Sequence, residues 1–125
     1  MSEELLQTNV IKYLNIKYPK IRYCASLGGI RTSIKQAVKA KATGYVKGHP
    51  DLVIYEPRGK YFGLFIEIKY KGYASKDQKQ WINDLNDRGY LACCLKGFDA
   101  ITETIDIYLK LTPSKYEKSK HKTKN

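Results

Sequence analysis

Apolar residues recur along this chain with two periods, one typical of helices and one typical of strands. Residues 2–18 follow the helical period and place four apolar side chains on one face: Leu6, Val10, Ile11 and Leu14. Ser2 precedes this pattern as a candidate cap and Pro19 follows it, so the sequence predicts a first helix between them.

The remaining pattern alternates between strands and helices. It predicts, in order, a strand at 21–27, a helix at 31–43, strands at 51–55 and 61–70, a helix at 75–89, a strand at 90–95 and a helix at 98–111. We expect the third helix to begin at Ser75 and end at Gly89, with Trp81, Ile82 and Leu85 facing inward. This succession predicts an α/β fold in which helices flank a mixed β-sheet.

The length of the chain predicts a single domain. All of the periodic pattern falls within residues 1–112 of the 125. Residues 113–125 have no apolar period and carry five lysines against one acid, which favours a disordered basic tail.

The charge of the chain is strongly positive and unevenly distributed. Lys and Arg exceed Asp and Glu by 23 to 12, and no acid lies between Leu5 and Pro50. Such a surface attracts polyanions, and DNA is the natural candidate, although a merely soluble basic surface is the alternative. No apolar run approaches the ~20 residues of a membrane-spanning helix, and no N-terminal segment resembles a signal peptide. We therefore expect no membrane association.

Four basic residues of this region are candidates for phosphate binding: Arg31, Lys35, Lys39 and Lys47. The first three are spaced four apart, which places them along one ridge of the predicted second helix. For Arg31 a simple turn before the helix is an equally good interpretation.

Three cysteines and two histidines limit the chemistry further. Cys93 and Cys94 are adjacent in an apolar run, and with Cys24 they make an odd number, which predicts small core residues in a reducing compartment instead of disulfides. The few histidines and the lack of a Cys-x-x-Cys pair argue against structural zinc. A metal here would prefer oxygen ligands.

The segments 51–55 and 61–70 are separated by a short turn containing Pro and Gly, which predicts an antiparallel hairpin. If this hairpin folds symmetrically about Gly59, Asp51 lies opposite Glu67. Directly opposed side chains point to the same face of a sheet, with Cβ atoms roughly 5 Å apart. Lys69, two residues after Glu67, shares that face.

Two carboxylates at this separation repel each other unless a positive charge lies between them. Mg²⁺ is held in proteins by one or two carboxylates, with substrate phosphate and water. The pattern therefore predicts a metal site for phosphodiester hydrolysis, in which Lys69 orients the nucleophile or stabilises developing negative charge. The alternative is an exposed strand edge with alternating charges. Against it, the charged residues interrupt the most apolar strand, whose opposite face is formed by Phe62, Leu64, Ile66 and Ile68.

The same residues resemble a known family. Gly48-His49-Pro50-Asp51 followed by Glu67-Ile68-Lys69 resembles the motif of the PD-(D/E)xK nuclease superfamily, and Ser75-x-x-Gln78-x-x-Trp81 is similar to the virus-type replication-repair nuclease (VRR-NUC) domain. The resemblance runs from about Glu3 to Leu109 and implies a restriction-endonuclease-like core. It also implies Mg²⁺ or Mn²⁺ as cofactor, with four metal ligands: Glu3, Asp51, Glu67 and the carbonyl of Ile68. Glu4 is the rival of Glu3 as the acid of the first helix.

By the same resemblance the catalytic set is Asp51, Glu67, Lys69 and Gln78, where Gln78 supports the site. His49 either contacts the metal or DNA, or is a loop histidine hydrogen-bonded to backbone. Small stand-alone members of phages and bacteria are similar to homodimeric Holliday-junction resolvases. This implies a structure-selective DNA endonuclease of recombination and repair that acts on four-way junctions as a homodimer in the cytoplasm. The alternatives are a nickase or flap-type nuclease, and a non-catalytic basic nucleic-acid-binding module.

Overall fold

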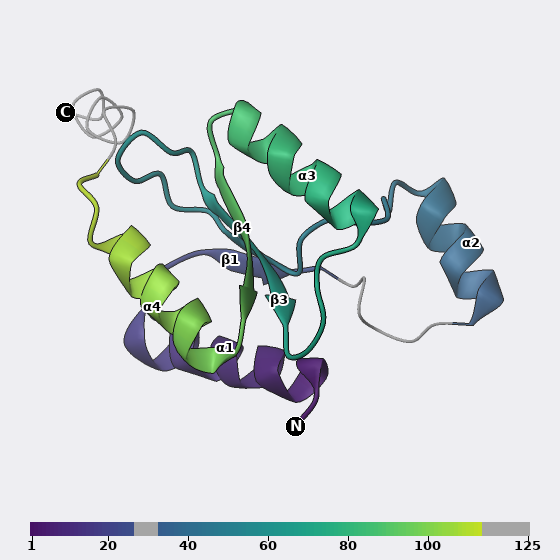
Figure 1. Cartoon of the computed structure of the whole chain (residues 1–125), viewed down its shortest axis with the longest axis horizontal. Coiled ribbons are helices and arrows are strands. Elements are labelled where there is room, and N and C mark those ends of the chain that lie inside the picture. The colour runs from purple at the N-terminus through teal and green to yellow at the C-terminus, as the bar shows by residue number, and fades with distance from the viewer. Residues whose placement is uncertain (27–32, 114–125) are drawn as a thin grey trace.

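A computed structural model describes residues 1–26 and 33–113 of the chain. Eight elements follow one another: α1 (Glu3–Lys17), β1 (Tyr23–Ala25), α2 (Ile34–Ala42), β2 (Leu52–Ile54), β3 (Leu64–Lys69), α3 (Lys76–Asp87), β4 (Leu91–Lys96) and α4 (Phe98–Leu109). The predicted α/β architecture is confirmed (Figure 1). The predicted positions of Arg31 and of the tail from residue 114 lie outside the described residues.

The four strands form one mixed sheet in the order β1-β2-β3-β4. The pairs β1–β2 and β2–β3 are antiparallel, whereas β3 and β4 are parallel because α3 connects them. The pairs between β2 and β3 are Leu52 with Ile66, Val53 with Phe65 and Ile54 with Leu64. This is the hairpin register predicted from symmetry about Gly59.

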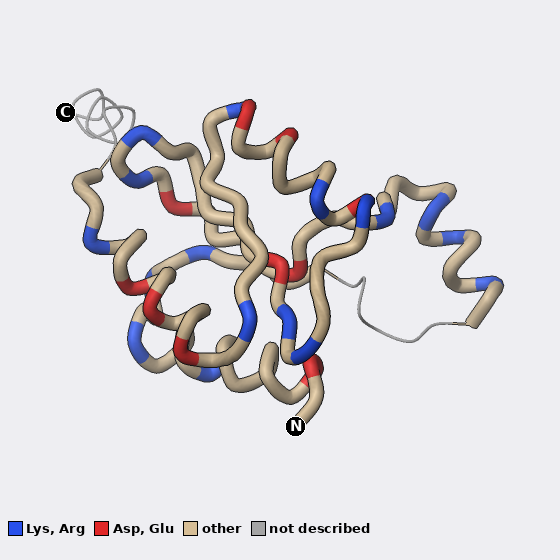
Figure 2. The backbone as a smooth tube through the Cα atoms, viewed as in Figure 1, with Lys and Arg blue, Asp and Glu red and all other residues tan. Residues whose placement is uncertain are grey.

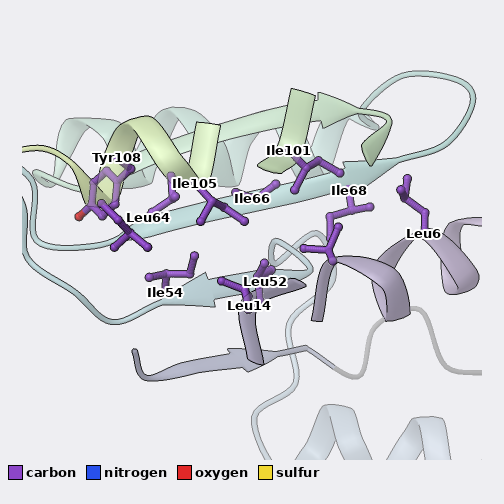
Figure 3. Close-up of a cluster of buried hydrophobic side chains, with 12 residues drawn as sticks. Leu6, Leu14, Leu52, Ile54, Leu64, Ile66, Ile68, Ile101, Ile105 and Tyr108 are labelled. Atoms are coloured by element: carbon purple, nitrogen blue, oxygen red, sulfur yellow. The ribbon is translucent and has the colours of Figure 1, made fainter. Parts of the chain in front are cut away.

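The core lies between one face of the sheet and the helices α1 and α4 (Figure 3). Alternate residues of the strands point into it, among them Leu52, Ile54, Leu64, Ile66 and Ile68, and α1 and α4 contribute Leu6, Val10, Leu14, Ile101, Ile105 and Tyr108. Burial of each such side chain stabilises the fold by about 1.5–3 kcal/mol. The predicted apolar face of α1 is confirmed, and Ser2 Oγ caps the helix by accepting a hydrogen bond from the Leu5 N–H at 3.1 Å.

Two expectations about burial are wrong. Phe62 is exposed, because β3 begins only at Leu64 and the intervening residues do not continue the alternation. Cys24 and Cys94 are also exposed, while Cys93 is partly buried against the core. Strand alternation sends the two adjacent cysteines to opposite faces, so only one of them can reach the core. All three thiols are free, as expected.

The second helix is set apart from the sheet (Figure 1). Ser33 begins α2 with a capping box, in which its hydroxyl accepts from the Gln36 N–H and the Gln36 side chain accepts from the Ser33 N–H. No residue of this fully described helix is buried, and Ile34 and Val38 are among its exposed apolar side chains. No helix in the described ranges 1–26 and 33–113 is long and apolar enough to cross a membrane.

Candidate active site

The face of the sheet opposite the core carries the predicted acids. Asp51 directly precedes β2, and extending the observed register by one residue places it opposite Glu67 of β3. Because side chains alternate along a strand, Leu64, Ile66 and Ile68 turn to the core while Glu67 and Lys69 turn to the other face. The hairpin thus brings together the two acids and the lysine that the sequence analysis singled out.

Glu67 is the buried charge at the centre of this site, with 2% of its surface exposed. Its Oε2 accepts a hydrogen bond from Gln78 Nε2 at 3.0 Å and lies 3.6 Å from Lys69 Nζ. Its Oε1 is also buried and finds no hydrogen-bond partner among the described residues. An unsatisfied carboxylate oxygen inside a protein is costly, so this atom calls for either a proton or a bound ligand.

The electrostatics of Glu67 agree with that geometry. Burial raises the pKa of Glu67 to about 8, repulsion by the Asp51 carboxylate contributes to this rise, and Lys69 opposes it. One lysine therefore does not compensate for two carboxylates at this depth.

Asp51 is held by the backbone of the neighbouring strand. Its Oδ2 accepts a hydrogen bond from the Ile68 N–H at 2.8 Å. A strand residue in an antiparallel pair directs its N–H and C=O to the same neighbour, so the Ile68 carbonyl faces the side on which Asp51 lies. The Ile68 carbonyl therefore lies on the same side of β3 as Asp51, and its role as a metal ligand stays a prediction.

Gln78 is oriented by the start of α3. Ser75 Oγ accepts from the Gln78 N–H at 3.2 Å, and Gln78 Oε1 accepts from the Ser75 N–H at 2.8 Å, which completes a capping box. Because the amide oxygen is engaged at the cap, the amide nitrogen is the group that faces Glu67. The Ser-x-x-Gln spacing thus serves the helix and the site at once.

The turn before Asp51 packs tightly on α3. Gly48 has a φ of +94°, and a Cβ at this position would lie 2.8 Å from the backbone carbon of Asp77. Trp81 Nε1 donates to the Lys47 carbonyl at 3.2 Å on the same turn. His49 Nδ1 lies 2.8 Å from the Pro50 carbonyl oxygen, which favours the backbone-bonded interpretation of this histidine.

The donor set fits a divalent cation with oxygen ligands. Two carboxylates lie on one face, and one of their oxygens is buried with no hydrogen-bond partner in the part of the chain that the structure describes. No cluster of three or more His, Cys, Asp or Glu residues occurs within the described ranges, so backbone carbonyl, water and phosphate would complete the coordination. Glu3 and Glu4 are exposed in the first turn of α1 and are not part of such a cluster.

The predicted phosphate-binding lysines are exposed. Lys35 and Lys39 lie on α2, which carries several basic residues and no acid (Figure 2). Lys47 Nζ lies 3.8 Å from Asp77 Oδ2 in an exposed ion pair, which contributes little to stability. Their side chains are therefore accessible to a polyanion.

Sequence reasoning missed the position of Cys94. In the parallel pairing of β3 with β4, Cys94 is the partner of Glu67 and Lys96 is the partner of Lys69. Burial raises the pKa of the Cys94 thiol, and the Glu67 carboxylate adds to the shift. No local pattern indicates the register of two strands that a helix separates.

A mixed sheet that presents two acids and a lysine on one face, with a helix N-terminus positioned over them, is the architecture of a nuclease-like α/β domain. Comparison with known proteins specifies the family. The sequence model of the VRR-NUC domain matches residues 6–99, and the chain belongs to this family. A solved structure described as a "VRR_NUC domain protein" is similar over 90% of this chain and 92% of its own, with 35% identity and a TM-score of 0.77. No curated protein matches the chain.

The raised pKa of Glu67 predicts a pH-dependent stability. In the unfolded chain Glu67 ionises near 4.5, whereas in the folded protein it retains its proton up to about pH 8. The folded state therefore binds the additional proton between these values, and this contribution to the free energy of unfolding is lost as pH rises from about 4.5 to about 8. Glu67→Gln should remove that loss, as measured by urea unfolding with EDTA at pH 5, 7 and 9.

The exposed Asp87→Asn variant is the matched control and should follow the wild type at every pH. Added Mg²⁺ should stabilise the wild type at pH 9 and leave Glu67→Gln unchanged. If the free energies of unfolding of wild type and Glu67→Gln depended on pH in the same way, the raised pKa of Glu67 would be contradicted.

Proposed function

We propose that this VRR-NUC protein is a metal-dependent, structure-selective DNA endonuclease that acts as a homodimeric Holliday-junction resolvase. The observation that carries the proposal is the buried, unpartnered Glu67 Oε1 beside Asp51. A purely structural or DNA-binding role gives no reason to bury the Glu67 carboxylate beside a second carboxylate where phosphate is to approach. Family membership implies a nuclease domain with DNA as its substrate.

The residues have distinct tasks in this proposal. Asp51, Glu67 and the Ile68 carbonyl would hold Mg²⁺ or Mn²⁺, which polarises the scissile phosphate and lowers the pKa of a bound water. Lys69, whose side chain is 14% exposed, has its Nζ 3.6 Å from Oε2 of the same carboxylate and would orient that water or stabilise charge on the phosphate. Gln78 fixes the Glu67 carboxylate through its amide nitrogen.

Recognition of DNA would begin with long-range attraction. The chain has a formal net charge of +11, and α2, which lies apart from the sheet, carries several lysines (Figure 2). Lysines that contact phosphates release counterions and give affinity without sequence preference. We place the enzyme in the cytoplasm of a bacterium or of a phage-infected host, because its three thiols are free.

A dimer is proposed because residues 1–26 and 33–113 of one chain provide one such site. Resolving a four-way junction requires two cuts in strands related by approximate two-fold symmetry, and a C₂ dimer is the commonest closed assembly. The exposed Ile34 and Val38 of α2 offer apolar surface for a second copy to cover. A monomer would nick a junction but not resolve it, and preference for flaps in the same assay would instead support a flap nuclease.

Removing either acid should abolish cleavage. Asp51→Asn and Glu67→Gln should each lower the rate of metal-dependent cleavage to the background. Binding of DNA in EDTA below about pH 8 should stay equal in Glu67→Gln, because that carboxyl is already protonated, and should stay equal or become tighter in Asp51→Asn, which loses a charge that repels phosphate. Gel assays with four-way junction, flap, single-stranded and linear duplex DNA, with and without Mg²⁺ or Mn²⁺, measure the rate. Asp87→Asn is the control.

Lys69→Met provides the contrast within this experiment. It should retain metal binding by calorimetry and lose rate. Cleavage at the wild-type rate by either acid variant, or unchanged metal affinity in both, would refute the metal site.

The lysines of α2 should set the salt dependence of affinity. Replacing Lys35 and Lys39 together by Ala should weaken binding to all DNA forms and reduce the slope of log affinity against log salt by up to about 1.8, at about 0.9 per lost phosphate contact. The matched double variant Lys12→Ala with Lys110→Ala, on α1 and after α4, should have a smaller effect. An unchanged slope would place DNA elsewhere on the surface.

The working unit should be a symmetric dimer. Analytical ultracentrifugation should give about twice the chain mass of 14.4 kDa, and cuts on a four-way junction should map to symmetric positions on opposing strands. Mixing wild-type with Asp51→Asn chains should yield heterodimers that leave singly nicked junctions. A protein that remains monomeric on junction DNA would contradict the resolvase and leave the nuclease.

A further inference from the structure

A pocket of about 410 Å³ lies beside the candidate active site, between α3, β4 and the segment that joins β3 to α3. Its lining includes Tyr73, Lys79, Ile82, Asn83, Cys94 and Lys96. The proposed hydrolysis of a phosphodiester makes no use of these side chains. The pocket therefore raises the question of what it binds.

The pocket lies next to the site on the same face of the sheet. Cys94 and Lys96 are the register partners of Glu67 and Lys69 on the neighbouring strand, so their side chains share the face that carries the acids. Adjacent strands lie about 4.8 Å apart. On the helical side, Lys79 directly follows Gln78, which donates to Glu67. A molecule in the pocket would thus lie next to whatever is bound at the acids.

The side chains that line the pocket are suited to a ligand that has a negative charge and a planar ring. Lys79 and Lys96 supply two positive charges, and none of the lining residues in the described part of the chain is an acid. The ring of Tyr73 is 85% exposed and therefore presents an open surface. Lys96 Nζ lies 4.3 Å from the centroid of this ring, so the cation and the aromatic surface form one unit.

We propose that this pocket receives one unpaired nucleotide of the DNA substrate next to the scissile phosphate. Its base stacks on Tyr73, and its phosphate lies between Lys79 and Lys96. A base inside a duplex already has both faces covered by its neighbours, whereas a nucleotide at a branch point can leave the stack at lower cost. The inference rests on the proposed nuclease function, whether the branched substrate is a four-way junction or a flap, and gives that function a physical source of structure selectivity.

Binding without cleavage tests this proposal. Fluorescence anisotropy in EDTA compares the intact duplex with a duplex that carries an unpaired arm at a branch. Tyr73→Ala should weaken binding to the branched DNA about tenfold, within the range that one stacked base contributes, and leave duplex binding unchanged. Tyr73→Phe should retain affinity because it keeps the ring. Tyr55→Ala, which removes another exposed tyrosine with 58% exposure, is the control and should have no effect.

An abasic nucleotide moved through the unpaired arm identifies the base that stacks. With the abasic nucleotide at one position of the arm, wild-type protein should bind about as weakly as Tyr73→Ala binds the arm with all its bases. Tyr73→Ala should bind that abasic DNA no more weakly, because each change alone already removes the stacking contact. Equal loss on duplex and branched DNA, or no loss at all, would overturn the pocket assignment. Circular dichroism checks that each variant is folded.

The outcome is separable from that of the proposed function. If Tyr73→Ala binds normally while Glu67→Gln abolishes metal-dependent cleavage, the subsite is refuted and the nuclease stands. If binding follows the Tyr73 expectations but no metal-dependent cleavage is found, the proposal of catalysis is refuted and the nucleotide pocket stands.

Discussion

Repulsion between the Asp51 and Glu67 carboxylates, on neighbouring strands and with Glu67 buried, is the constraint on which the rest of the site depends. The protein offsets it only in part: Lys69 lies near one oxygen, Gln78 donates to the same oxygen, and the other oxygen has no partner among the described residues. A fold usually avoids such an arrangement, because an unpaired buried charge costs several kcal/mol unless it is protonated or neutralised. Without a metal ion, the raised pKa allows Glu67 to take up a proton and so removes the repulsion. A divalent cation bound by the two carboxylates would neutralise them instead.

This constraint explains why α3 lies where it does. The helix must begin close to β3 for Gln78 to reach Glu67, and the Ser75 capping box provides the orientation at the same time. Gly48 allows the preceding turn to approach the first turn of α3 without a side chain in between, which places Asp51 at the start of β2. Stability and function therefore share these residues, and replacing Gly48 would disturb both.

The parts of this arrangement that the sequence could predict are the local ones. Alternation along 61–70 and a turn centred on Gly59 determine the hairpin register, and with it the meeting of Asp51 and Glu67. Capping at Ser75 follows from a spacing of three residues. Nothing local indicates how β3 pairs with β4, so the position of Cys94 beside Glu67 and the pocket near it became apparent only in the folded chain. Cys24 and Cys94 were wrongly predicted to lie in the core. An apolar run does not reveal which of its alternate residues point inward.

In such a protein, affinity for DNA and selectivity among DNA structures would come from interactions that act over different distances. The positive charge of α2 would act over about a Debye length of 8–10 Å, which exceeds the reach of any single contact, so it would attract every form of DNA alike. A cation held by two carboxylates would not distinguish branched from linear DNA either, because every phosphodiester presents the same phosphate group to it. The proposed discrimination between branched and linear DNA would therefore have to come from a short-range contact close to the acids that a regular duplex is unable to make. Stacking on an exposed ring next to Lys96 meets this requirement, since it needs a base with a free face and lies one strand away from Glu67.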